Sequence, residues 1–439
     1  MSTQPFRLSD AALTALGAGR PTADTLGTLR RAERTRQLLF LRQALRGVSG
    51  DPGWYADDPM TGLWAALPER GTRGPCGPHV LTSRCAGLTL TVRLEDTDPV
   101  RSRLGLTPTP ALSPAEVAHW RTCLDRAWTV LVHRHRPAAE TMAAVLRVIV
   151  PVRPDPSAEG ISATSTEAFG AVAMSSPAGP DALAAGLLHE TQHSVLNATH
   201  LLFDLVEPGG PAGYSPWRDD PRPAFGVLHG AYAYLAVTRF RRSEPGRAAA
   251  FEFARWRSAV AGAAAGLLAG GELTPAGVRF TSALLAEVRS WCDEPVEPEI
   301  QRLADLANAD HRARWRLRNL TVAPEDTARL VAAWHAGSGP PPIAGVLTTT
   351  SGRALANSPR LPLIRAMVDG RELGGGADAA CVRGDHGAAV TAYQNNWDGL
   401  ALVSPHPALR HRPEVVRAAA LALPGVPVGS LADWLSYCT

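Results

Sequence analysis

The residues best suited to chemistry are the two histidines of the segment His189-Glu190-Thr191-Gln192-His193. The apolar pairs Leu187-Leu188 and Val195-Leu196 flank this segment. They predict that it lies in a partly buried helix from Asp181 to Leu205. On a helix, residues four apart lie on one face, about 6 Å apart along the axis, so both imidazoles can bind one ion. The pattern therefore predicts a metal site, with Glu190 between the two ligands.

A catalytic metal ion usually has a third protein ligand and keeps at least one position open. We favour His229, because it opens a second predicted helix, Phe225 to Phe240, after a loop long enough to turn the chain back. Glu207, at the exit of the motif helix, is the alternative third ligand. His200 would lie about 16 Å farther along an unbroken helix than His189, so we interpret it as a residue that supports the ligands from outside or merely packs.

The elements around the motif predict an α+β fold that is mostly helical. We expect a strand at Leu88–Leu94, a buried strand at Val145–Val152 and strand-like structure from Ile161 to Ser175. Ser113 and Glu116 form a capping-box pattern at the start of a helix that runs to about His133. Residues 51–78 are rich in Gly, Pro and Trp and are predicted to be an irregular connection. Further helices are predicted at 248–268, 274–292, 297–317 and 324–335.

The predicted domain organisation is one large metal-dependent domain, 1–335, followed by a helical region, 343–439. The residues that form the site are expected within about 80–320. Residues 337–342 resemble a linker, and the stretch from Gly384 to Tyr393 resembles one degenerate helix hairpin of a tetratricopeptide array.

Composition argues against several classes of partner. The 44 basic and 41 acidic residues leave a net charge of +3, and the arginines do not gather into a stripe, so we expect neither nucleic-acid nor membrane binding. Residues 1–10 lack a signal pattern and no apolar run approaches a membrane span. We therefore expect a cytoplasmic protein whose scattered cysteines stay reduced.

Three segments in this order resemble the HExxH-domain proteins encoded beside ribosomal peptide gene clusters, the α-ketoglutarate-dependent HExxH-type peptide β-hydroxylases. The three are the stretch from Leu187 to Ser194, the proline-rich loop from Tyr214 to Pro223, and the stretch from Gly226 to Ala233. The resemblance runs from about Leu8 to Leu317. The radical-SAM domain that usually accompanies this family is absent from the sequence.

The resemblance implies an Fe(II) enzyme that uses O₂ and 2-oxoglutarate to hydroxylate the β-carbon of a residue in a precursor peptide. Three imidazoles leave three coordination sites, enough for a chelating ketoacid and O₂. In this interpretation Arg218, with Arg222 as the second choice, binds the distal carboxylate of 2-oxoglutarate. An ion pair with Asp219 or Asp220 that merely holds the loop is the alternative for both arginines.

The peptide is expected to lie near Tyr214 and Trp217, although such aromatic residues often serve only packing. By similarity to zincin folds, we expect a small sheet packed on the motif helix, with the strand ending at Met174 as the edge to which an extended peptide adds.

A zinc metallopeptidase is the rival interpretation, with Glu190 as general base and His189, His193 and either His229 or Glu207 as ligands. In a hydroxylase Glu190 has no required proton to take. A non-catalytic module with a structural metal is a third interpretation, but structural zinc sites prefer four protein ligands. The sequence does not predict the peptide, the modified residue or the oligomeric state.

Overall fold

The computed structural model describes residues 6–45, 57–67, 79–156, 158, 160–348, 358–394 and 396–437. Within these residues the chain is mostly helical and contains one small mixed sheet, which confirms the predicted mostly helical α+β class. None of the described helices is both long and apolar enough to cross a membrane.

The chain divides into two compact units. The first comprises residues 1–210, 224–243 and 260–291, and the second comprises 211–223, 244–259 and 292–439. These bounds do not coincide with the predicted division at 335–343. The reason is that α10 (Pro298–Asn319) packs its apolar face on α12 (Leu361–Val368), through Leu303 and Ile364 among others.

A five-stranded sheet forms the centre of the first unit, with the strand order β1-β2-β3-β5-β4. Its strands are β1 (His79–Cys85), β2 (Leu88–Leu94), β3 (Val148–Val152), β4 (Ser162–Ala163) and β5 (Ala171–Ser175). The pair β1–β2 is antiparallel, β2–β3 and β3–β5 are parallel, and β4 runs antiparallel to β5 at the edge.

The structure corrects one predicted strand position and one predicted irregular segment. The strand ending at Met174 is not the sheet edge, since β5 lies between β3 and β4. The two-residue β4 is too short to leave a period-two pattern, so the sequence did not reveal the true edge. The segment 51–78 is also not wholly irregular, because its described part contains α3 (Pro59–Ala66), which Asp58 caps.

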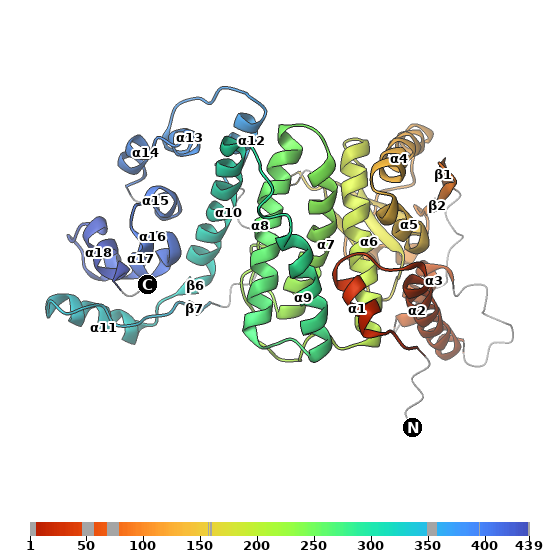
Figure 1. Cartoon of the computed structure of the whole chain (residues 1–439), viewed down its shortest axis with the longest axis horizontal. Helices are drawn as coiled ribbons and strands as arrows, with labels where there is room; N and C mark the ends of the chain where they lie inside the picture. Colours follow the sequence, from red (N-terminus) through yellow and green to blue (C-terminus); the bar gives the residue numbers. More distant parts are fainter. Residues whose placement is uncertain are drawn as a thin grey trace. The chain divides into compact units, whose positions relative to one another are not determined.

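Helices cover both faces of the sheet (Figure 1). Because strand side chains alternate, Ile149 and Val172 point to one face, into a core shared with α4 (Pro114–Arg134), α5 (Arg136–Val145) and α6 (Pro180–Leu202). Val150 and Ala173 point to the other face, towards α3 and the 3-10 helix η2 (Pro99–Leu104).

The remaining helices of the first unit are α1 (Asp10–Gly17), α2 (Ala23–Ala44), α7 (Ala224–Ser243), α9 (Pro275–Arg289) and the C-terminal part of α8 (Arg247–Gly270). Of these, α2 and α7 pack against α6, and α9 packs against α1 and α7. The capping box predicted at Ser113 and Glu116 is present at the start of α4. The predicted helices 181–205 and 225–240 correspond to α6 and α7, which lie side by side (Figure 1).

The second unit is built from short helices after α10. These are α11 (Pro324–His335), α12, α13 (Ala377–Arg383), α14 (His386–Tyr393), α15 (Trp397–Val403), α16 (Pro407–His411), α17 (Pro413–Ala422) and α18 (Val428–Ser436), with a two-stranded sheet of β6 (Leu320–Thr321) and β7 (Val346–Leu347). The predicted hairpin consists of α13 and α14, and Gly384 between them has φ +84°. Its likeness to a tetratricopeptide repeat stays a prediction.

Candidate metal centre

The motif helix α6 is held in place by packing against other parts of the protein. Pro180 opens it at a position where a missing N–H costs nothing, and its buried residues include Leu183, Leu187 and Val195. Gly186 allows close packing on the sheet, because a Cβ there would lie 2.8 Å from Cε of Met174. The helix that carries the motif is therefore held rigidly in the core.

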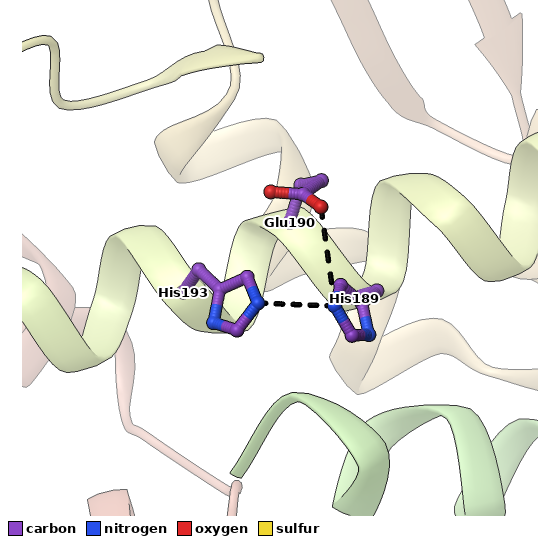
Figure 2. A group of neighbouring side chains, drawn as sticks. All are labelled: His189, Glu190 and His193. Atoms are coloured by element: carbon purple, nitrogen blue, oxygen red, sulfur yellow. Dashed lines mark hydrogen bonds and ion pairs between the residues drawn. The ribbon is translucent and has the colours of Figure 1, made fainter. Parts of the chain in front are cut away.

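His189 and His193 face each other on α6 (Figure 2). Their Nε2 atoms lie 3.0 Å apart, and the two rings meet edge to face with centroids 4.5 Å apart. Two imidazole nitrogens that each lie about 2.1 Å from one ion, at a right angle to each other, are about 3.0 Å apart. The spacing of the pair thus fits two ligands of a single ion.

His229 on α7 lies directly against this pair. Its ring is stacked on the ring of His193, with centroids 3.7 Å apart and planes 8° apart. The helix pair therefore brings the predicted third histidine to the predicted site. One group of potential metal ligands among the described residues is formed by His189, Glu190 and His193, whose ligand atoms all lie within 4.8 Å of one another. To bind the same ion, the ring of His229 must turn out of the stack.

Burial favours the uncharged form of His189 and His193. It lowers the pKa of His189 to about 4, with a smaller contribution from the nearby His229. Burial also lowers the pKa of His193 well below its ordinary value, and His189 and His229 add to the effect. Neutral imidazoles have free lone pairs, which is the form that binds a divalent metal.

Several polar atoms around the pair have no partner. Among the described residues, Nδ1 of His193, Oγ1 of Thr191 and Oε1 of Gln192 are buried without a hydrogen bond. Metal-bound histidines usually donate their second N–H to a carboxylate or carbonyl, so the unpaired Nδ1 of His193 is a departure from that pattern. Unmatched polar atoms are costly in a core, and their concentration here marks the cluster as a site for a ligand.

Glu190 is bonded at one carboxylate oxygen, and its Oε2 is buried without a hydrogen-bond partner among the described residues. The hydroxyl of Ser162, on the edge strand β4, donates to Oε1 of Glu190 at 2.6 Å, and the side chain of Thr164 bonds the same carboxylate. Glu190 is 1% exposed, and burial raises the pKa of its carboxyl to about 7 despite these two bonds. Its Oε1 lies 3.9 Å from Nε2 of His189.

The other two candidate ligands lie elsewhere in the first unit. Glu207 is exposed, and its backbone N–H donates to the carbonyl of Glu272, so its carboxylate is not part of the cluster. His200 stacks on Phe225 at 4.4 Å, and its Nδ1 accepts a hydrogen bond from the backbone of Leu205. His200 therefore packs against Phe225 and is not part of the cluster.

Three residues near the pair were missed from the sequence. Ser162 and Thr164 bond Glu190, but the two-residue strand that carries Ser162 gave no pattern. Tyr234 meets the ring of His189 edge to face, with centroids 5.2 Å apart. Tyr234 lies about 140° around α7 from His229, so helical spacing gave no signal that would have identified it.

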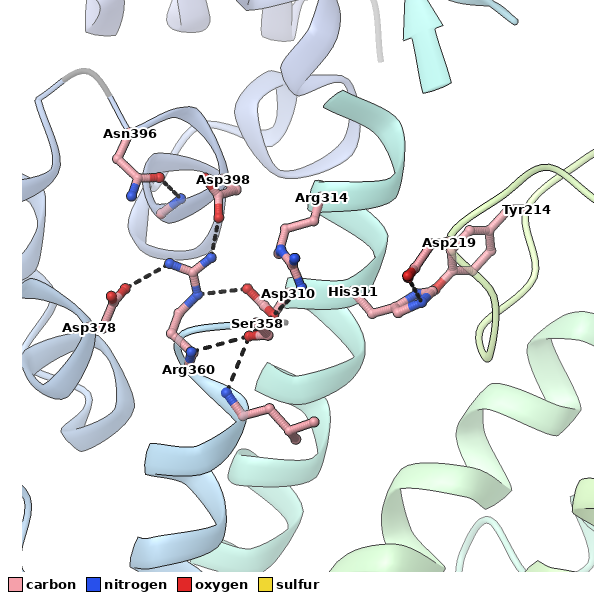
Figure 3. Close-up of polar contacts among 12 residues, drawn as sticks. Tyr214, Asp219, Asp310, His311, Arg314, Ser358, Arg360, Asp378, Asn396 and Asp398 are labelled. Carbon is pink, nitrogen blue, oxygen red and sulfur yellow. Dashed lines mark hydrogen bonds and ion pairs between the residues drawn. The ribbon is translucent and has the colours of Figure 1, made fainter. Parts of the chain in front are cut away.

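The predicted cosubstrate and peptide residues all belong to the second unit. Arg218 and Arg222 both pair with Asp220, each at 3.1 Å. Tyr214 bonds Nδ1 of His311 on α10 at 3.0 Å (Figure 3), and Trp217 is half-buried in the same loop. Both arginines thus form the loop-holding ion pair considered as the alternative, and their role towards 2-oxoglutarate stays a prediction.

Comparison with known proteins adds no relative. No protein-family model matches the chain, and a search of curated proteins found no significant match.

Proposed function

We propose that the chain is an Fe(II)- and 2-oxoglutarate-dependent dioxygenase that hydroxylates the β-carbon of a residue in a ribosomally made precursor peptide. It would act in the cytoplasm and belong to the HExxH-type β-hydroxylases that its sequence resembles. The observation that carries the proposal is the meeting of three imidazoles, from His189, His193 and His229, in the first unit.

His189, His193 and His229 would hold the iron. Bound iron supplies the redox chemistry by which O₂ oxidises a C–H bond while 2-oxoglutarate loses CO₂ and becomes succinate. Three neutral protein ligands leave three of six positions for cosubstrates, whereas a hydrolytic zinc site needs only one or two. The buried environment favours the uncharged form of His189 and His193, which is the form that such binding requires.

Glu190 supports the hydroxylase over a peptidase through its contacts. A general base must reach a water molecule, but this carboxylate is buried and accepts the Ser162 hydroxyl at one oxygen. We infer that Glu190 positions β4 against α6 and takes no proton from substrate.

The neighbourhood of β4 suggests how a peptide would bind. We infer a zincin-like arrangement, in which the motif helix packs beneath a mixed sheet whose edge strand runs antiparallel to its neighbour. One side of β4 pairs with β5, and an extended peptide could add to the other side. Ser162 on this strand links such a peptide to the motif helix through Glu190.

The alternative is a zinc metallopeptidase with Glu190 as general base, and one observation favours it. A carboxyl with a pKa of about 7, whose oxygen lies 3.9 Å from His189, is suited to proton transfer near neutral pH. In this case His229, and not Glu207, would be the third ligand.

Anaerobic reconstitution with Fe(II), followed by titration with 2-oxoglutarate, separates the two functions. For the hydroxylase we expect a metal-to-ligand charge-transfer band in the wild type and in Glu190→Gln, and its loss in His229→Ala. The role predicted for Arg218 is tested in the same titration, since Arg218→Ala should then weaken 2-oxoglutarate binding. Peptide cleavage by the zinc form without O₂, abolished by Glu190→Gln, would establish the peptidase instead.

A further inference from the structure

A cavity in the first unit lies between α2, the end of α5 and the connection from β4 to β5. Its volume is about 50 Å³, and since one ordered water needs on the order of 10–15 Å³ on this measure, it suits a group of carboxylate size. Polar side chains dominate its lining: Arg30, Glu33, Arg34, Gln37, Asp57 and Arg147.

The two carboxylates of the lining already have cationic partners. Glu33 pairs with Arg36 at 2.7 Å, and Asp57 pairs with Arg34 at 3.0 Å. The positive charges of Arg30 and Arg147 are therefore left in excess around the cavity.

Arg147 is held in a fixed orientation beside the cavity. Its guanidinium donates to the backbone carbonyls of Ala143, Ala144 and Leu146, at the C-terminal end of α5. Burial lowers the pKa of Arg147, the charge of Arg30 lowers it further, and Asp57 opposes both effects. Two guanidinium groups are thus close enough to repel each other, and an anion between them would relieve that repulsion.

A buried amide completes the set. Gln37 is 4% exposed and lines the cavity. Within the described part of the chain, neither the side chain of Gln37 nor that of Arg30 makes a hydrogen bond or an ion pair. A buried amide without partners is costly. A ligand that brings hydrogen-bond acceptors into the cavity would satisfy the amide and both cations together.

We propose that this cavity is a binding site for a carboxylate group, recognised by Arg30, Gln37 and Arg147. The planar forks of two guanidinium groups match the two oxygens of a carboxylate, and the amide N–H₂ of Gln37 is a further donor. The carboxylate belongs either to a small free acid or to an acidic side chain of a peptide. This site is independent of the metal centre and of the function proposed for it.

Calorimetric titration of the metal-free full chain tests the site with two probes. One probe is malonate, and the other is a short peptide with a single glutamate and blocked ends, compared with its glutamine analogue. We expect saturable binding of at least one carboxylate probe and no binding of the glutamine analogue. Since a hydrogen bond to a charged group contributes a factor of about ten or more in affinity, Arg30→Gln and Gln37→Leu should each weaken binding about ten-fold.

Arg31→Gln is the matched control, because Arg31 lies next to Arg30 on α2, does not line the cavity, and its side chain bonds only Thr28 among the described residues. It should bind as the wild type does. Binding of malonate points to a free acid, and binding of the glutamate peptide alone points to a peptide. The proposal is overturned if neither carboxylate binds, or if Arg30→Gln and Gln37→Leu bind as tightly as the wild type.

Discussion

Two buried polar clusters, one in each unit, differ in whether their polar atoms have partners. In the second unit the fully buried guanidinium of Arg360 pairs with Asp310 at 2.6 Å, with Asp378 at 2.7 Å and with Asp398 (Figure 3). Tyr393 also donates to Asp378. In the first unit, by contrast, His193 and its neighbours Thr191 and Gln192 leave buried atoms without hydrogen bonds.

This difference separates a structural cluster from a candidate binding site. The Arg360 cluster joins α10, α12, α13 and α15 through contacts that satisfy one another, so it needs no ligand to be stable. The histidine cluster keeps neutral nitrogens facing each other in a core that could have been filled with apolar side chains. Such a cost is expected where a ligand restores the missing interactions.

The largest effect on stability is expected for Arg360→Met. Removing the guanidinium leaves the buried carboxylate of Asp310 without its closest charged partner, which should lower the free energy of unfolding by about 3–5 kcal/mol. Urea unfolding of the metal-free chain measures it. Arg371→Gln, which removes an exposed pair with Asp369, is the control and should change stability by less than about 1 kcal/mol. Equal effects of the two changes would contradict the structural role.

A pH-dependent effect is expected from Glu33, which is buried beside Arg36 in the first unit. Burial raises the pKa of its carboxyl from the ordinary 4.5 to about 7, so its contribution to stability is fully present below about pH 4.5 and is lost as the pH rises through about 7. Between these limits the wild type should lose about 3 kcal/mol relative to Glu33→Gln.

Urea unfolding of both proteins at several pH values between 5 and 8 measures this difference. A constant difference between the two proteins across that range would show that the carboxyl of Glu33 titrates alike in the folded and unfolded chains.

The smallest effect on the stability of the metal-free chain is expected for His193→Leu. The change removes a buried imidazole whose Nδ1 has no partner among the described residues, and leucine has a similar volume. Its cost should stay within about 1 kcal/mol, because loss of an unsatisfied polar group offsets lost packing. A loss as large as that of Arg360→Met, measured by the same unfolding experiment, would remove the contrast between the clusters.

Sequence patterns predicted the helices and the motif well, because both depend on local spacing. The capping box at Ser113, the strand Leu88–Leu94 and the helix pair that carries His189 and His229 are all present. The prediction that His229 returns to the motif required only a long loop followed by a helix, and the stacked rings of His193 and His229 are consistent with it.

What the sequence could not predict depends on contacts between distant segments. β4 contains two residues, and it becomes a strand only because it pairs with β5. The bond from Ser162 to Glu190 follows from that pairing. The division into two units depends on a similar contact, since the packing of α10 on α12 joins residues about sixty positions apart.

The most direct test of the central claim is anaerobic titration of the metal-free chain with Fe(II), measuring affinity and stoichiometry. We predict one ion per chain in the wild type and in the control His200→Ala, whose side chain stacks on Phe225 and lies outside the cluster. His193→Ala and His229→Ala should each weaken binding by about 100-fold or more, since even residues that only support a ligand contribute 10–100-fold. Wild-type affinity in His229→Ala, or no bound ion in the wild type, would contradict the claim that three imidazoles form this metal centre.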